Sequence, residues 1–346
     1  MNAGAIWWGQ IGNSLRLLSK VTNNLRDCQS AVLQVPRNLP WRKDFYEAVD
    51  VRRLAFSAER RLMRLEWKEN AVPGEFILDE LCSEKVRAEY WPGKTYAAYL
   101  GSMDDILLND YYVWITGVHS KPDLLKWTEF ITQYEHAAQQ LRNRAVFLIE
   151  YDGSGPEQSM VEHIVYTVEN YDCRVFCLEL AAARNNTDIH TYQAELAFNL
   201  GSDAPELCSA LIDLGEQFLL DPVQATDCAM QILGFDRQKE QEIVSAAWKA
   251  AILHLFPVLE QYRMDFVMKH KNVLAKYLPI SNSNGDRVVD PFDLELGALC
   301  YITGLGSKEF TTEDVEYLRQ CRKVRNLLAH NKVVPYEDVR RIICRH

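Results

Sequence analysis

Short apolar runs separated by helical segments are the feature that most limits how this 346-residue chain can fold. Residues 111–118 (YYVWITGV), 145–153 (AVFLIEYDG) and 173–180 (CRVFCLEL) are rich in Val, Ile, Phe or Tyr, and a fourth run covers 30–36 (SAVLQVP). Runs of this kind favour strands buried on both faces. Helix-like stretches such as 121–142 lie between them. The alternation predicts an α/β domain with a mostly parallel sheet and flanking helices.

The same pattern predicts how the chain divides. A short amphipathic helix is expected within residues 1–24, and the α/β domain over residues 25–200. Strand-like runs then disappear, so residues 201–239 are expected to form a small helical segment placed like a lid. Residues 240–346 are expected to form an all-α bundle of about four helices. The predicted fold class is an α/β domain followed by a helical bundle.

Local signals give further expectations. Helical segments are predicted over residues 42–61 and 159–170. A loop is predicted over residues 279–290, which are rich in Ser, Asn, Gly and Pro. Pro257 is expected to kink or break the long helical pattern around it.

Composition excludes several classes of protein. The chain is 48% hydrophobic and 25% charged, which is ordinary for a globular protein and excludes a mainly disordered one. No apolar run approaches the roughly 20 residues that cross a bilayer, and the N-terminal segment lacks the pattern of a secretion signal. The nine cysteines are scattered, so they are interpreted as reduced thiols of a cytoplasmic protein. No zinc site, other metal or cofactor is expected.

Two segments bear on whether the α/β domain holds a nucleotide. Residues 91–96 (WPGKTY) match the end of the phosphate loop G-x-x-x-x-G-K-[ST], but Ala88 stands where its first glycine is required, which favours a surface turn. The first strand runs into residues 36–41 (PRNLPW), which contain two prolines and neither glycine nor lysine. Proline lacks the backbone N–H that a phosphate loop supplies. Tight ATP binding is therefore not expected.

The order of these parts resembles an ATPase module of the AAA/STAND type that has lost its phosphate site. Its acidic strand, which often holds magnesium in that fold, is matched by the run that ends near Glu150 and Asp152. An unrelated doubly wound domain is the alternative. Because ligands bind at the carboxyl ends of strands in such sheets, His119, Lys121, Glu150 and Asp152 are candidate ligand contacts. No serine lies in a G-x-S-x-G elbow, which excludes that class of hydrolase.

The C-terminal end is basic although the whole chain carries a net charge of −10. From residue 319 to residue 346, eight Lys and Arg residues stand against two Asp and Glu residues. The charge of the whole chain does not favour nucleic acid, but a concentrated basic patch attracts a phosphate backbone even on an acidic protein. This region is therefore the predicted site for RNA.

Helical spacing places several polar side chains of the basic region on one face of a predicted helix. Arg322, Asn326 and His330 lie four residues apart and share one face, with Arg325 beside it. An apolar stripe is expected along the same helix, formed by Leu318, Cys321, Val324 and Leu328. A guanidinium clamps a phosphate and an imidazole moves a proton at neutral pH. The set therefore has the groups needed to cleave RNA without a metal.

The segment RNLLAH has the form R-N-x-x-x-H, and with the helices around it residues 240–346 resemble the HEPN superfamily. The resemblance implies a dimer in which Arg and His of two protomers face each other. Many members of the superfamily are ribonucleases that leave a cyclic phosphate, so the resemblance also implies this activity. It assigns catalysis to Arg325 and His330, together with Asn326, the polar residue that follows the arginine. The predicted phosphate contacts are Arg322, Lys323 and Lys332.

Three functions are compatible with these patterns. The first is a metal-independent endoribonuclease in bacterial anti-phage defence or a toxin–antitoxin system, whose α/β domain senses or holds a partner without binding ATP. The second is a non-catalytic scaffold of a defence complex, with a pseudo-nucleotidase domain and a dimerising bundle. The third is a receptor for a nucleotide or another small ligand, bound at the strand ends near His119. The expected partners are RNA, a second copy of the chain and other defence proteins, and no membrane is expected.

Overall fold

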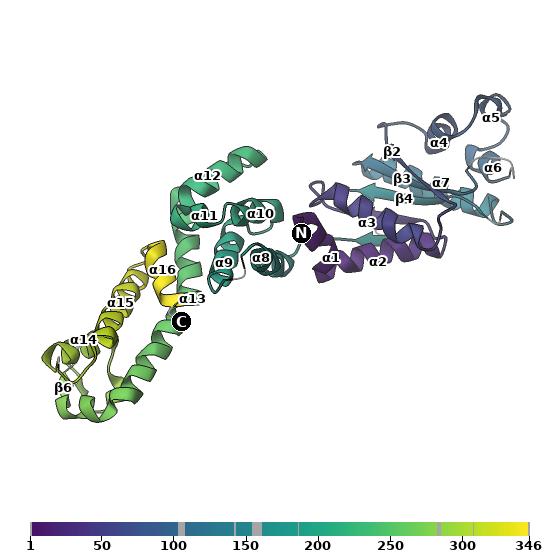
Figure 1. Cartoon of the computed structure of the whole chain (residues 1–346). Coiled ribbons are helices and arrows are strands. Elements are labelled where there is room, and N and C mark those ends of the chain that lie inside the picture. Colours follow the sequence, from purple (N-terminus) through teal and green to yellow (C-terminus); the bar gives the residue numbers. More distant parts are fainter. Residues whose placement is uncertain are drawn as a thin grey trace. The chain divides into compact units, whose positions relative to one another are not determined.

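The computed structural model divides into two compact units, Met1–Asp172 and Cys173–His346, which we call the α/β unit and the helical unit (Figure 1). The residues that it describes are 2–102, 108–141, 143–153, 161–185, 187–281, 285–306 and 308–344.

The α/β unit is built on one five-stranded sheet. Its strands are β1 (Ala31–Gln34), β2 (Arg61–Glu66), β3 (Tyr111–Val118), β4 (Val146–Tyr151) and β5 (Glu162–Val165). Their order is β2-β3-β4-β1-β5, and every neighbouring pair is parallel. The strands predicted near residues 30–36, 111–118 and 145–153 are confirmed, and so is the predicted α/β fold followed by helices.

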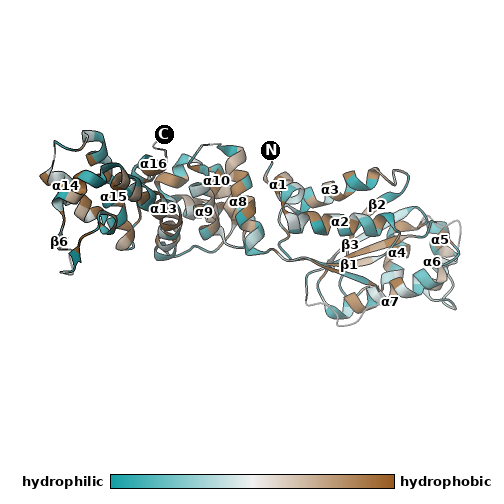
Figure 2. Ribbon diagram, turned by 90° about the horizontal axis from the view of Figure 1, so that it is seen from below, coloured by the Kyte–Doolittle hydropathy of each residue, from teal (hydrophilic) through white to brown (hydrophobic). Residues whose placement is uncertain are grey.

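Helices cover both faces of this sheet (Figure 2). On one face lie α1 (Ala3–Gln10), α2 (Gly12–Arg26) and α3 (Arg42–Leu54). On the other lies α7 (Lys121–Ala137), which packs with α4 (Pro73–Leu81) and α6 (Tyr96–Gly101); the short α5 (Glu84–Ala88) precedes α6. The chain leaving β1 enters α3 and the chain leaving β3 enters α7, so it departs to opposite faces. Such a divergence opens a crevice at the carboxyl ends of the strands.

Alternation along the strands decides which side chains reach this crevice. Val113 and Phe147 point into the apolar core under α7, which includes the buried Trp127. Their neighbours point the other way because successive strand residues face opposite sides of a sheet. Trp114 therefore packs edge-on against Phe45 of α3, with ring centroids 5.6 Å apart. Glu150 shares this side of the sheet with Trp114.

Two strands and one helix differ from the sequence predictions. Residues 42–61 were expected to be helical, but α3 ends at Leu54 and β2 begins at Arg61. Residues 159–170 were expected to be helical as well, but 162–165 form β5 at the sheet edge. The run 173–180 was expected to be a strand, but it lies within the helix α8 (Asn170–Arg184). The boundary between the two compact units lies between Asp172 and Cys173, within this helix.

A long helix organises the helical unit. It is α13 (Glu240–Leu274), and it packs against α9 (His190–Gly201) and α12 (Pro222–Leu233). Between these lie α10 (Pro205–Asp213) and α11 (Glu216–Leu220). The helix passes through Pro257 without a break, and its backbone first leaves helical angles at His270. Of the kink or break predicted at the proline, the break is therefore absent.

The C-terminal helices complete the unit. After the short helix η1 (Ala275–Tyr277), β6 (Ile280–Ser281) and β7 (Arg287–Val288) pair as a small antiparallel ribbon, where only a loop was predicted. The 3₁₀ turn η2 (Pro291–Asp293) leads into α14 (Leu296–Leu305). The last elements are α15 (Thr312–Ala329) and α16 (Tyr336–Ile343), both packed against α13.

One helix among the described residues is long and apolar enough to span a membrane by length and composition. It is the segment Glu240–Tyr277, and 39% of its most apolar window is buried within the protein. Core helices share these properties, and this segment packs against α9, α15 and α16.

Candidate functional site

The basic C-terminal region is carried by α15. Thr311 caps its N-terminus, because the hydroxyl oxygen accepts a hydrogen bond from the Asp314 backbone N–H at 3.1 Å. The predicted apolar stripe is confirmed, since all its members are buried: Leu318, Cys321, Val324 and Leu328. Burial of this stripe fixes the rotation of the helix, so the opposite face is turned outward.

The C-terminal end of α15 is closed by a backbone motif that explains why Asn331 follows the helix. His330 is the C-cap, and Asn331 adopts a left-handed conformation with φ of 53°. The Lys332 N–H then donates to the Leu327 carbonyl at 2.9 Å, which is the wrapped ending that asparagine permits. The Trp248 indole of α13 donates to the Leu328 carbonyl at 2.8 Å. His330 is therefore held at a fixed helix end with its side chain exposed.

The predicted site residues on α15 fall into two groups. Arg322, Asn326 and His330 are exposed, as helical spacing predicted. Lys323 instead forms an ion pair of 2.6 Å with Asp338 of α16, whose side chain is only 5% exposed. This lysine is engaged in holding α16 on α15, so the structure makes it a weaker candidate for a phosphate contact. Lys332, also predicted to contact phosphate, is exposed just beyond the helix.

Arg325 has a partner that the sequence did not reveal. Its guanidinium lies 3.2 Å from the carboxylate of Glu295, the residue before α14. The arginine side chain is 33% exposed and the glutamate 74% exposed, so the pair is open to water. The acidic segment DPFDLE (290–295) contains this glutamate, but the acidic residues within 313–316 and 337–338 are closer to Arg325 along the chain, so the sequence did not single it out.

Arg325 also borders a cavity of about 410 Å³ in the helical unit. Arg263 of α13 forms one wall, and its donors are directed to Glu260 and to the carbonyls of Phe292 and Leu294. The full lining is Phe256, Leu259, Glu260, Arg263, Phe292, Asp293, Leu294, Glu295, Leu296 and Arg325. His330 is not part of it.

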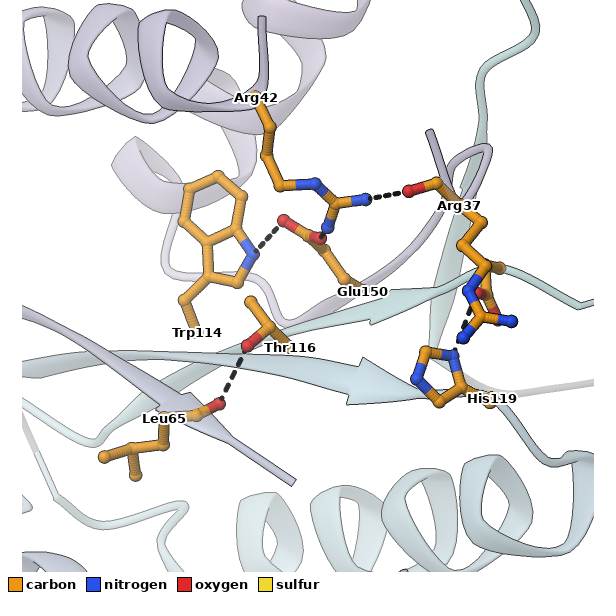
Figure 3. A network of polar contacts seen from close by, with 8 residues as sticks. Arg37, Arg42, Leu65, Trp114, Thr116, His119 and Glu150 are labelled. Carbon is orange, nitrogen blue, oxygen red and sulfur yellow. Dashed lines mark hydrogen bonds and ion pairs between the residues drawn. The ribbon is translucent and has the colours of Figure 1, made fainter. Parts of the chain in front are cut away.

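A second cluster lies at the carboxyl ends of the strands in the α/β unit (Figure 3). The Glu150 side chain, 3% exposed, accepts hydrogen bonds from the Arg42 guanidinium and, at 3.0 Å, from the Trp114 indole. Arg42 also donates to the Arg37 carbonyl at 2.8 Å. Burial raises the pKa of Glu150 above its ordinary value, although Arg42, Tyr46 and Trp114 act in the opposite direction.

The other predicted strand-end residues lie beside this pair. His119 Nδ1 is 2.9 Å from the Asp152 carboxylate, and both line a cavity of about 330 Å³ that also holds Glu150. Lys121 is the first residue of α7, after the Ser120 cap, and does not line the cavity. Three of the four candidate ligand contacts are therefore brought together.

The strand-end cluster does not fit the magnesium that the AAA/STAND resemblance implies. The Glu150 oxygens accept hydrogen bonds from a guanidinium and an indole, both of which a cation would have to displace. No group of three His, Cys, Asp or Glu side chains able to hold a metal occurs among the described residues. The stretch 91–96 is a surface turn, in which Thr95 caps α6 and the Lys94 N–H donates to the Trp91 carbonyl.

Comparisons with known proteins add little to this geometry. No protein-family model matches the chain, and no curated protein matches it. Among solved structures, a single-residue variant of RuvB from Thermotoga maritima is similar at 13% sequence identity and a TM-score of 0.35, over 72% of this chain and 77% of that chain. A TM-score of this size does not establish a common fold.

Proposed function

We propose that the helical unit is a metal-independent endoribonuclease of the HEPN kind, with Arg325 and His330 as catalytic residues and Asn326 beside them. The observation that carries the proposal is the arrangement at the end of α15. Asn326 and His330 are exposed there, and Arg325 lies at the edge of a cavity, on a helix held in place by its buried stripe. A guanidinium stabilises the charge that develops on a phosphate under attack, and an imidazole transfers the proton.

Helical geometry favours a second protomer in this site. Residues five apart on an α-helix point about 140° away from each other, since each residue turns the helix by about 100°. Arg325 and His330 of one chain therefore do not converge on one phosphate from the same helix. A homodimer that sets the arginine of one protomer opposite the histidine of its partner meets this requirement. Arg322 and Lys332, both exposed, then extend the contact along the RNA backbone.

The α/β unit has a different role in this proposal. Its first strand leads into a loop with two prolines, and Arg42 binds the carboxylate of Glu150. Both features oppose nucleotide hydrolysis at this position. We assign to this unit the binding of a partner or signal in a bacterial defence or toxin–antitoxin system.

A non-catalytic scaffold is the second candidate. The ion pairs Arg325–Glu295 and Lys323–Asp338 favour it, because they use two of the cations that an RNA backbone would need. Such a protein would dimerise through its helical unit and cleave no RNA.

The deciding experiment compares purified wild type with His330→Ala on total RNA in the presence of EDTA, which removes metal-dependent contaminants. Loss of an acid or base typically lowers the rate by about a hundredfold or more, so the variant should leave the RNA intact. Its thermal unfolding should be unchanged, because the side chain is exposed. The matched control is His136→Ala, an exposed histidine of α7.

Three outcomes are informative. Fragments ending in a 2′,3′-cyclic phosphate from wild type and the control alone support the ribonuclease. Equal cleavage by His330→Ala, or no cleavage by any of the proteins, contradicts it. Mixing Arg325→Ala with His330→Ala should restore part of the activity if the two groups come from different protomers.

A further inference from the structure

In one wall of the cavity beside Arg325, the hydrogen-bond donors of Arg263 are all used within the protein. Arg263, with a side chain 14% exposed, places its N–H groups on the Glu260 carboxylate, the Phe292 and Leu294 carbonyls and the Met264 sulfur. These contacts account for the five donors that a guanidinium has. Arg263 therefore fixes the segment 292–294 against α13 and has no donor left for a guest.

The groups that remain open to a guest are mainly acceptors. Asp293 is exposed, and no described residue donates a hydrogen bond to its carboxylate. Glu295 pairs only with Arg325 among the described residues, across a contact open to water. An aromatic ring, Phe256 of α13, is 49% exposed at the same cavity. The cavity thus offers a flat apolar surface, carboxylate acceptors and one guanidinium at its edge.

We propose that this cavity holds a guanine base of the RNA, in the nucleotide next to the phosphate bound by Arg325. The inference rests on the proposed ribonuclease function. Single-stranded bases are recognised by stacking on aromatic rings and by hydrogen bonds to their edges. Guanine presents two adjacent donors, N1–H and the N2 amino group, which match the two oxygens of one carboxylate. Asp293 is the acceptor for this pair, and Phe256 is the stacking surface.

The other bases fit this set less well. Adenine and cytosine each have one exocyclic amino group next to a ring nitrogen that is an acceptor, and that acceptor would face the carboxylate. Uracil has a single N–H between two carbonyl oxygens. A carboxylate beside an acceptor is repulsive, so Asp293 selects against these edges as well as for guanine. The cavity volume of about 410 Å³ lies within the range of small-ligand pockets.

Mapping the cleavage sites on a mixed-sequence RNA tests the proposal. Wild type should show guanine at one fixed position beside the cleaved bond. Asp293→Asn keeps the size of the side chain but replaces one acceptor by a donor, and should reduce the preference for guanine about tenfold. Phe256→Ala should weaken cleavage at all sites, since stacking tolerates any base. The controls are Asp265→Asn and Leu253→Ala, exposed residues of α13 outside the cavity.

The proposal and the function it rests on fail in different ways. Cleavage with no base preference, with a preference for another base, or with a preference unchanged in Asp293→Asn overturns the guanine site and leaves the ribonuclease intact. If no cleavage occurs, the guanine site is tested by binding instead. Labelled octanucleotides with and without a single guanine are titrated with the full chain. Tighter binding of the guanine oligonucleotide that Asp293→Asn abolishes supports the site, and equal binding of the two overturns it.

Discussion

The two units each place an arginine on a glutamate; the two arginines are equally exposed, at 33%, but the two glutamates differ in their access to water. In the α/β unit Arg42 meets Glu150, whose side chain is 3% exposed and also accepts a hydrogen bond from Trp114. In the helical unit Arg325 meets Glu295, whose side chain is 74% exposed. Removing one partner of a buried pair leaves a charge without compensation, whereas an exposed pair exchanges its partner for water at little cost.

This difference separates structure from function. A phosphate that displaced Glu295 from Arg325 would leave no buried carboxylate behind, because the Glu295 side chain is 74% exposed. A ligand that displaced Glu150 from Arg42 would leave the Glu150 carboxylate buried and without a compensating charge. The pair on the sheet is therefore a fixed part of the α/β fold, whereas the pair beside α15 is the one that the proposed RNA-binding function can use.

The largest effect should come from breaking the buried pair. Arg42→Ala should lower the free energy of unfolding by about 3 kcal/mol near neutral pH, because the buried Glu150 carboxylate loses the cation that compensates its charge. Urea unfolding followed by tryptophan fluorescence measures it, since every tryptophan except Trp248 lies in the α/β unit. The exposed pair Arg26–Asp27 supplies the control, as Arg26→Ala should change the value by less than about 1 kcal/mol.

A double variant sharpens the same comparison. Arg42→Met combined with Glu150→Gln removes both charges and should recover most of the stability that Arg42→Ala loses. A double variant as unstable as the single one would show that the pair is not what holds this part of the sheet.

The pH dependence of Arg42→Ala should be the next largest effect. Burial raises the pKa of Glu150 in the folded protein, and the loss of Arg42 removes an influence that lowers it. Between the unfolded and folded pKa values the folded state holds a proton that the unfolded state has released, so stability falls as the pH rises through this window. The loss caused by Arg42→Ala should accordingly be smaller at about pH 5 than at about pH 8. A difference from wild type that does not vary with pH would argue that Glu150 stays solvated.

The smallest effect should come from the exposed pair. Glu295→Gln should increase RNA cleavage by no more than about fivefold, since exposed ion pairs contribute roughly 0.2–1 kcal/mol. Stability should hardly change. Glu313→Gln, an exposed acid at the other end of α15, is the control for general charge effects. A decrease in cleavage with Glu295→Gln would mean that the carboxylate takes part in the reaction or in binding the substrate.

Strands were predicted well where burial is continuous and poorly where it is not. β3 and β4 are central strands with long apolar runs, and the predicted runs cover both of them. The edge strand β2 (RLMRLE) has charged residues at three of its six positions, and the edge strand β5 has only four residues. Edge strands are half solvated, so they lack the continuous apolar run that marks a central strand. The sequence predicts a strand at 173–180 because apolar residues also occupy the outer face of α8, where Leu178 is 38% exposed, and so hide the helical spacing of the buried ones.

In the candidate site, the sequence predicted what depends on local spacing but not the contacts between distant segments. The exposed face of α15 followed from helical spacing, which is a local property. Lys323 was predicted to bind phosphate, but its partner Asp338 comes from the next helix. No sequence pattern predicted the cavity residues Arg263, Phe256 and Asp293, because a cavity is formed by segments that are distant along the chain.

The amino-acid sequence was enough to predict an α/β fold followed by helices and the two faces of α15, and it contains no glycine-rich phosphate loop after the first strand. Periodicity, capping and proline chemistry act over a few residues, so they can be read along the chain. The choice of carboxylate that each arginine meets depends on how distant segments pack. Arg42 and Glu150 are 108 residues apart, and Arg325 and Glu295 are 30 apart. The burial that makes one pair permanent and the other exchangeable arises only when sheet, helices and loops are packed together.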